Sequence, residues 1–309
     1  MRFYEFEKYQ MDRFINQHFV ILRGPRLSGK SHFIREYFEG SQENYVIFDV
    51  FNAWMKKDLW VVRGLVEDLK LSIETSAPVG SVVFFNLDGI GDFNDFHSML
   101  SALPQGTHVV FDHAEFFGYA RKDDGDPREF FQEFIDLGHL RFVFVPRSTS
   151  RLLNYLGVGD YSSPLFGRFE VFVEVVPLSP NESIKFLGDC PFDVVRVYGL
   201  TGGLRGALEL LRSVDCDIKE YRRMISKIAL RDLAPKGPKK GRKLVEVAAA
   251  VAKETRVREY VKREDIVQKY GIDEKSLSRY LFPLYELGYV DFLNKDMVKT
   301  PIPFQFFDI

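Results

Sequence analysis

Eight residues near the N-terminus, Gly24–Ser31, constrain the fold of this chain most strongly. They read G-P-R-L-S-G-K-S and match the phosphate-loop pattern G-x-x-x-x-G-K-S/T at every fixed position. The apolar run 19–22 before them predicts a buried strand, and the apolar positions after Ser31 recur at helical spacing. Because phosphate binding by this pattern needs a strand, the loop and a helix in that order, the flanks support a phosphate site.

The loop residues have distinct expected roles in holding a nucleotide. The two glycines allow the backbone to fold around a phosphate with several N–H groups pointing inward, and the following helix adds its positive end. We expect Lys30 to reach the β- and γ-phosphates and the Ser31 hydroxyl to bind Mg²⁺. The chain has no guanine-reading Asn/Thr-Lys-x-Asp motif, which favours ATP over GTP. The expected nucleotide-binding residues of the loop are Gly24, Pro25, Arg26, Leu27, Ser28, Gly29, Lys30 and Ser31.

Apolar runs alternate with helical patterns through the first half of the chain. This alternation predicts an α/β fold with a parallel sheet that is covered by helices on both faces. Ligands of such sheets bind beyond the carboxyl ends of the strands, where the phosphate loop lies. The predicted strands are 19–22, 45–50, 81–85, 107–112 and 141–145; the predicted helices are 57–71, 93–103 and 128–137, with a loop over 72–80.

Polar residues follow two of these strands and are the candidate catalytic residues. Asp112 ends the run 107–112 and is expected to hold the Mg²⁺ shell, or else to cap the turn that follows. Many related enzymes place a water-polarising glutamate next, where this chain has His113, with Glu115 two positions further on. Either side chain would activate water, or hydrolysis is slow or absent. Ser148 either senses the γ-phosphate or caps a helix.

The second half reads as mainly helical. Ser179, Pro180 and Glu182 form a capping-box pattern that predicts a helix start. The segment 235–243 is rich in Pro, Gly and basic residues, which predicts a linker. Three helical stretches and a strand pair follow, in the order typical of a winged helix-turn-helix. They are the helices near 243–254, 263–270 and 273–287 and the strands near 289–293 and 297–300.

Charge and composition limit the possible surroundings and partners. Residues 1–218 contain 22 Lys and Arg against 31 Asp and Glu, a balance of −9, whereas residues 219–309 contain 20 against 13, a balance of +7. The basic half would bind a polyanion such as double-stranded DNA, or dock on the acidic half. No apolar run suits a membrane span, and two distant cysteines, Cys190 and Cys216, predict neither a disulfide framework nor a metal site. We therefore expect a cytoplasmic protein.

At these motifs the chain resembles the archaeal ATPases of the STAND branch of AAA+ P-loop NTPases, over nearly its whole length. Beside the phosphate loop and Asp112, the resemblance rests on S-P-L-F-G-R at 163–168, V-P-L-S-P at 176–180 and T-G-G at 201–203. It implies that Arg168 meets the γ-phosphate, the alternative being a structural salt bridge. It also implies that Ser148 is a sensor and that Gly202 and Gly203 mark a lid near the adenine.

The resemblance implies a P-loop ATPase core over 1–178, a helical lid over 179–234, the basic linker 235–243 and a winged-helix domain over 244–309. The chain departs from the family at His113, at Arg205 in place of a proline, and at the tail 301–304, which replaces an Asp-Pro pair. The leading hypothesis is an ATP-binding switch with slow hydrolysis, using ATP and Mg²⁺ and capable of self-association. The second is a DNA-binding protein with ATP as a structural ligand. A kinase-like transferase is a third, without an acceptor-site signature.

Overall fold

The structure is a computed structural model in which most of the chain can be described. The described residues are 4–50, 73–76, 98, 100–119, 127–147, 149–157, 160–167, 171–233, 238–255, 260–286 and 289–300. The chain divides into an N-terminal unit, formed by Arg2–Gly24 and Lys30–Val175, and a C-terminal unit, formed by Met1, Pro25–Gly29 and Val176–Ile309. Most of the phosphate loop is therefore grouped with the second half of the chain.

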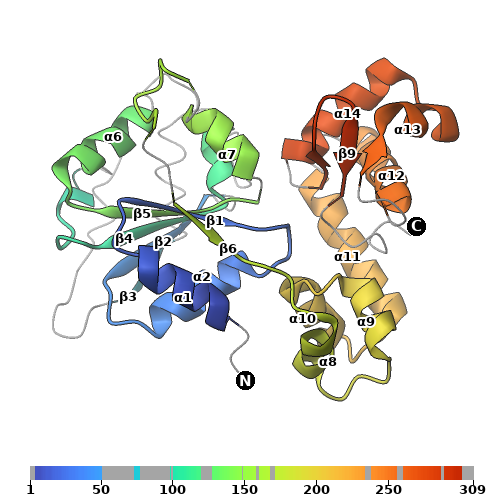
Figure 1. The fold of residues 1–309 in the computed structure, drawn as a ribbon, viewed down its shortest axis with the longest axis horizontal. Helices are drawn as coiled ribbons and strands as arrows, with labels where there is room; N and C mark the ends of the chain where they lie inside the picture. Colours follow the sequence, from blue (N-terminus) through green and yellow to red (C-terminus); the bar gives the residue numbers. More distant parts are fainter. Residues whose placement is uncertain are drawn as a thin grey trace. The chain divides into compact units, whose positions relative to one another are not determined.

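A six-stranded sheet of order β3-β2-β4-β5-β1-β6 organises the N-terminal unit (Figure 1). Five of its strands are parallel, four of them at apolar runs that were predicted as strands, and together with the helices they form an α/β core. The short strand β6 was not among the predicted strands. The parallel strands are β1 (Phe19–Arg23), β2 (Tyr45–Asp49), β4 (His108–Asp112), β5 (Arg141–Val145) and β6 (Phe172–Glu174).

The edge strand β3 (Ile73–Ser76) runs antiparallel to β2. The prediction of a loop over 72–80 is therefore wrong at these four residues. The segment I-E-T-S contains one strongly apolar residue, so its strand conformation comes from pairing with β2 rather than from its own pattern. The predicted strand 81–85, the predicted helix 57–71 and most of the predicted helix 93–103 lie outside the described residues.

Helices cover both faces of the sheet. Figure 1 shows α1 (Glu5–Phe14) and α2 (Lys30–Glu39) on one face, and α6 (Pro127–Leu137) and α7 (Thr149–Leu156) on the other. Strand side chains alternate between these faces, so that Val143 and Val145 pack in the cluster that includes Phe33 and Ile34 of α2. On the opposite face the rings of Phe111, Phe142, Phe144 and Phe131 form stacked and edge-to-face pairs.

Four helices follow the sheet: α8 (Pro180–Leu187), α9 (Val194–Thr201), α10 (Arg205–Ser213) and α11 (Ile218–Leu233). The predicted capping box at the start of α8 is confirmed. The Ser179 side chain accepts a hydrogen bond from the Glu182 N–H, and the Glu182 carboxylate accepts one from the Ser179 N–H. Apolar residues on the inner sides of these helices, including Val197, Leu208 and Tyr221, are fully buried.

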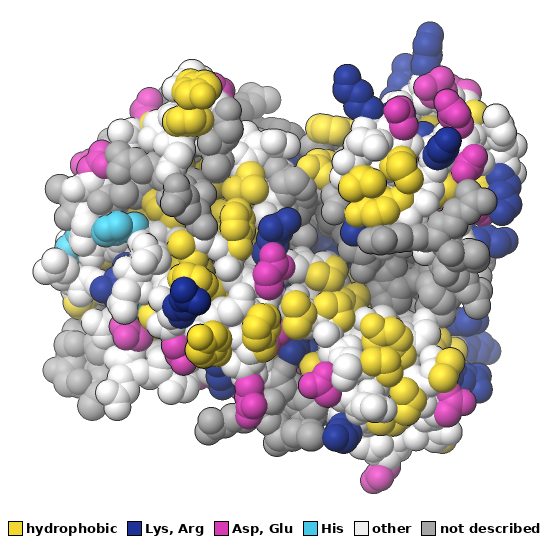
Figure 2. All heavy atoms as spheres, in the orientation of Figure 1, with side chains coloured by type: hydrophobic (Ala, Val, Ile, Leu, Met, Phe, Trp, Pro, Cys, Tyr) yellow, Lys and Arg dark blue, Asp and Glu magenta, His cyan; other side chains and the backbone are white. Residues whose placement is uncertain are grey.

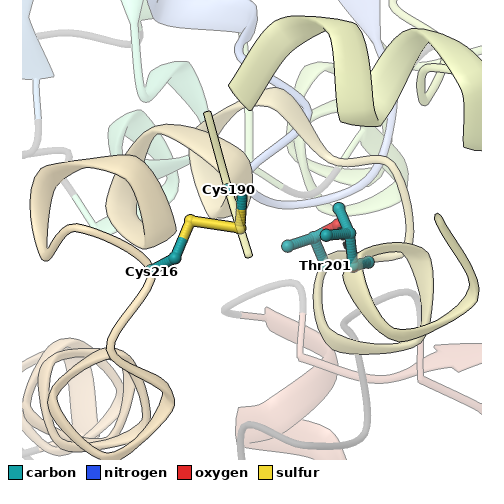
Figure 3. Close-up of a disulfide and its surroundings, with 4 residues drawn as sticks. Cys190, Thr201 and Cys216 are labelled. Carbon is teal, nitrogen blue, oxygen red and sulfur yellow. Dashed lines mark hydrogen bonds between the residues drawn. A yellow bond between two sulfur atoms is a disulfide. The ribbon is translucent and has the colours of Figure 1, made fainter. Parts of the chain in front are cut away.

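A disulfide joins Cys190, between α8 and α9, to Cys216, between α10 and α11 (Figure 3). Their Cα atoms lie 6.0 Å apart, a usual separation for a disulfide. The prediction that no disulfide forms is therefore wrong. No local sequence pattern indicated this contact, because the two cysteines are 26 residues apart. The packing of α8–α11 brings their two turns together.

The last part of the chain combines three helices with a small antiparallel sheet of order β7-β9-β8. Its elements are α12 (Pro238–Thr255), β7 (Val261–Lys262), α13 (Arg263–Tyr270), α14 (Glu274–Glu286), β8 (Asp291–Phe292) and β9 (Met297–Lys299). Residues 238–243, predicted as part of a linker, are instead the beginning of α12. Pro238 suits the first position of a helix, which explains why a Pro-Gly-rich segment is helical here. Among the helices that the structure describes, none is long and apolar enough to cross a membrane.

Candidate functional site

The phosphate-loop sequence has the local structure that its pattern requires. β1 ends at Arg23, α2 begins at Lys30, and the residues between them form a tight turn. Gly24 and Gly29 have φ values of 151° and 94°, conformations that L side chains rarely adopt. Within the turn, the Ser28 N–H donates a hydrogen bond to the Pro25 carbonyl at 3.2 Å. The predicted order of strand, loop and helix is therefore confirmed.

The charged and hydroxyl groups at the end of the loop both make hydrogen bonds. Lys30 is a buried residue, and its ammonium donates a hydrogen bond to the Gly24 carbonyl at 2.7 Å. The Ser31 hydroxyl donates to Oδ1 of Asp112 at 2.8 Å, which joins the start of α2 to the end of β4. A hydroxyl beside a carboxylate is the hard oxygen pair that suits Mg²⁺, so the residues present fit the expected metal.

The Asp112 side chain is only 1% exposed, and its carboxylate oxygens lie near several hydrogen-bond donors. Besides the Ser31 hydroxyl, Oδ1 accepts the N–H of His113 at 3.0 Å, and the Arg35 guanidinium lies 3.7 Å from Oδ2. Buried polar oxygens are stabilised by such hydrogen-bond partners. Arg35, one turn after Ser31 on α2, was not predicted. Its spacing of four residues from Ser31 on one helix face is the signal that could have identified it.

His113 lies next to this network and has an unusual backbone. Its φ of 59° is left-handed, and its N–H also donates to the Val145 carbonyl at 2.7 Å. Its Nδ1 lies 3.1 Å from Oδ1 of Asp49, the last residue of β2. Asp49 had no predicted role. A polar residue at the carboxyl end of a predicted parallel strand is the signal that would have pointed to it.

Three of the remaining predicted residues are described, and two are not. Glu115 is fully buried, and its Oε2 accepts the N–H of Arg147 at 2.9 Å. Gly202 and Gly203 follow α9 in the C-terminal unit, with φ values of 59° and 72°. Ser148 and Arg168 lie outside the described residues. The structure thus joins Lys30, Ser31, Asp112 and His113 into one site.

Residues 25–29 of the loop also make contacts within the C-terminal unit. The N–H of Gly206, in the first turn of α10, donates to the Leu27 carbonyl at 2.8 Å, and a Cβ at Gly206 would lie 3.0 Å from that oxygen. The guanidinium of Arg26 lies 4.6 Å from the ring centroid of Tyr289, just before β8. Arg205, also in the first turn of α10, donates to the Val176 carbonyl at 2.7 Å.

Within the described residues, no three His, Cys, Asp or Glu side chains are grouped to hold a metal ion.

The parallel sheet, the phosphate loop and the acidic residue at the end of β4 define the α/β P-loop NTPase fold. The chain is similar to the Walker-type ATPase PABY2304 of Pyrococcus abyssi, with 19% identity, a TM-score of 0.73, and coverage of 98% of this chain and 94% of that one. Weaker similarity extends to Cdc6p of Pyrobaculum aerophilum, with 13% identity, a TM-score of 0.42, and coverage of 96% and 88%. The likeness to the P. abyssi ATPase shows a shared fold.

Comparison of sequences alone identified no relative. No protein-family profile matches the chain, and no curated protein sequence matches it.

Proposed function

We propose that this chain is an ATP-binding ATPase of the AAA+ class, of the STAND type, that acts as a nucleotide-dependent switch and hydrolyses ATP slowly. The observation that carries the proposal is the hydrogen bond between Ser31 and Asp112 at the end of a correctly formed phosphate loop. It brings the two expected Mg²⁺ ligands together with Lys30, which is the arrangement that phosphoryl transfer needs.

Each residue of the site has a proposed role. Lys30 binds the β- and γ-phosphates, and Ser31 and Asp112 bind the Mg²⁺ that neutralises charge on them. His113 stands in the position of the water-polarising glutamate, which is why we expect slow turnover. Glu115 is the alternative, but its carboxylate holds the Arg147 N–H and would have to leave that contact. By resemblance, Arg168 meets the γ-phosphate, Ser148 senses it, and Gly202 and Gly203 lie near the adenine.

Contacts of the loop support the switch. The Leu27 carbonyl and the Arg26 guanidinium contact Gly206 and Tyr289 respectively, within one compact unit. In the proposal, α8–α11 form a lid and α12–β9 a winged helix. A nucleotide that reshapes the loop would change both contacts, so the C-terminal elements would report the nucleotide state. Added Mg·ATP should then alter amide exchange around Tyr289.

Replacement of the loop lysine tests nucleotide binding. Lys30→Ala removes a buried charge from the phosphates, and such losses cost about 2–5 kcal/mol, or roughly 30- to 5,000-fold in the dissociation constant of Mg·ATP. The matched control is Lys8→Ala. Lys8 is on α1 in the same unit, and its ammonium pairs with Glu36 on α2. Equal Mg·ATP affinity in wild type and Lys30→Ala would contradict the proposal.

DNA binding is the second candidate function. Lys and Arg side chains lie over α12–α14 at the upper right of Figure 2, interspersed with Asp and Glu, and Lys275 and Arg279 of α14 are exposed. Five cations lie between 236 and 243, one of which, Lys243, pairs with Glu246 at 2.8 Å. If these cations bind phosphates, their replacement by alanine should flatten the salt dependence of duplex binding by about 0.9 per lost contact. A wild type that binds no duplex DNA at low salt would rule this function out.

A further inference from the structure

Two aspartates lie side by side at the carboxyl edge of the sheet. The parallel pairing of β2 and β4 places Asp49 opposite Asp112, each at the last position of its strand. The side chain of Asp112 is buried, whereas that of Asp49 is 17% exposed. Asp49 therefore belongs to the edge where the phosphate loop ends, although its carboxylate does not bond to Ser31 as that of Asp112 does.

The Asp49 carboxylate contacts the ring of His113. Oδ1 of Asp49 lies 3.1 Å from Nδ1, and the other ring nitrogen, Nε2, lies 4.0 Å from Oδ1 of Asp112. A carboxylate accepts hydrogen bonds and does not donate them, so in the neutral ring it selects the tautomer in which Nδ1 carries the hydrogen. In that tautomer Nε2 is the hydrogen-bond acceptor of the ring.

The backbone of His113 limits where the ring can point. Its N–H bonds to the Val145 carbonyl on β5 and to Asp112, and its φ of 59° is a conformation that non-glycine residues adopt only when their surroundings require it. With the backbone held by β4 and β5 and the ring held by β2, three strands determine the direction of Nε2. This arrangement suits a group that must point at a particular atom.

We propose that Asp49 is a positioning residue that holds His113 so that Nε2 accepts a hydrogen bond from the water that attacks the γ-phosphate. The inference rests on the proposed ATPase function. The water oxygen bonds to the γ-phosphorus as the bond from that phosphorus to the β,γ-bridging oxygen breaks, and its electron pair stays on the bridging oxygen of ADP. Both water protons remain on the released phosphate, so that ATP⁴⁻ and water give ADP³⁻ and H₂PO₄⁻. In this step His113 orients the water, as such a residue does in other nucleotide hydrolases.

Other groups at this edge are less suited to accept a hydrogen bond from water. Lys30 and Arg35 have no acceptor atom, and Oδ1 of Asp112 already accepts from the Ser31 hydroxyl and the His113 N–H. The Glu115 carboxylate is fully buried against the Arg147 N–H. The His113 side chain, by contrast, is 19% exposed, so water can reach it.

The test uses the full-length protein and the variant Asp49→Asn, whose amide can donate to Nδ1 and so no longer selects one tautomer. The matched control is Glu174→Gln, an acidic residue at the end of β6, four strands away and so about 19 Å from Asp49. We measure kcat by phosphate release, the dissociation constant of Mg·ADP, and the ¹⁵N signals of the His113 ring in the nucleotide-free protein. The signals of His113 among the six histidines are assigned by their loss in His113→Ala.

We expect Asp49→Asn to lower kcat about 10²-fold, to leave Mg·ADP affinity unchanged, and to move the ring signals away from the Nδ1–H tautomer. In the His113→Ala background the same change should have no further effect on kcat, because Asp49 acts through His113. Unchanged kcat and ring signals in Asp49→Asn, or an equal loss of kcat in both backgrounds, would overturn the inference.

Failure of the proposed function gives different results. A wild type that binds Mg·ADP but releases no phosphate from ATP overturns the water-orienting role and leaves nucleotide binding intact. A wild type that binds no nucleotide overturns the proposed function and the role of Asp49 in it.

Discussion

Gly203, directly after the cap of α9, offers a quantitative test of how the C-terminal unit is held together. Its φ is 72°, and a Cβ built on it would lie 2.1 Å from the Leu178 carbonyl oxygen and 2.9 Å from the ring of Tyr198. The same backbone pair is already bonded, since the Leu178 N–H donates to the Gly203 carbonyl at 2.8 Å. Gly203→Ala must therefore push two hydrogen-bonded backbone segments apart.

The cost has two parts that a matched variant separates. An alanine in the left-handed region loses about 1–2 kcal/mol, and forcing extra atoms into a packed site costs a further 1–3 kcal/mol. Gly271, at the end of α13, has a left-handed backbone (φ 62°, ψ 29°) with no atom within 4 Å of its built Cβ. Gly271→Ala should therefore show the first part alone, and Gly203→Ala should lose about 1–3 kcal/mol more.

Native-state hydrogen exchange measures both variants, because it reports on α9 and α10 separately from α13 and from the sheet. We expect amides within α9 and α10 to lose more protection in Gly203→Ala than amides within α13 lose in Gly271→Ala. Equal losses in the two variants would show that the close approach of Leu178 to Gly203 does not constrain this unit. A smaller loss in Gly203→Ala than in Gly271→Ala would contradict the packing itself.

Two further predictions concern stability. Reduction of the Cys190–Cys216 disulfide, which closes a 26-residue separation, should cost about 3.5 kcal/mol in unfolding free energy by chain entropy. Urea unfolding with and without reductant measures this, and a reductant effect that persists in Cys216→Ser would contradict it. Burial lowers the pKa of His108 below its ordinary value of 6.5, so the unfolded chain binds the proton more tightly than the folded chain. The free energy of unfolding should therefore fall as the pH drops below 6.5, by up to about 1.4 kcal/mol per pH unit. His108→Gln should weaken this pH dependence relative to His18→Gln, an exposed control, and identical pH profiles would refute the assignment.

Local patterns in the sequence identified the parts of the site that depend on neighbours in the chain. The turn at Gly24–Ser31, the start of α2 and the capping box at Ser179 each involve residues within eight positions, so spacing and residue type were enough to predict them. The parallel strands β1, β2, β4 and β5 were predictable for a similar reason, because strands covered on both faces have runs of apolar residues. Asp112 followed from its place at the end of such a run.

Contacts between distant segments were decided by the tertiary structure alone. The pairing of β2 with β4 brings Asp49 beside His113 across 64 residues, and no local pattern marks that partnership. The strand conformation of I-E-T-S depends on β2, and the disulfide depends on the packing of α8–α11. Glu115 looked equivalent to His113 in the sequence, but the turn after Asp112 buries one side chain and leaves the other partly exposed. Register, burial and the direction of side chains are properties of the assembled sheet, because each is set by atoms that the chain brings together only on folding.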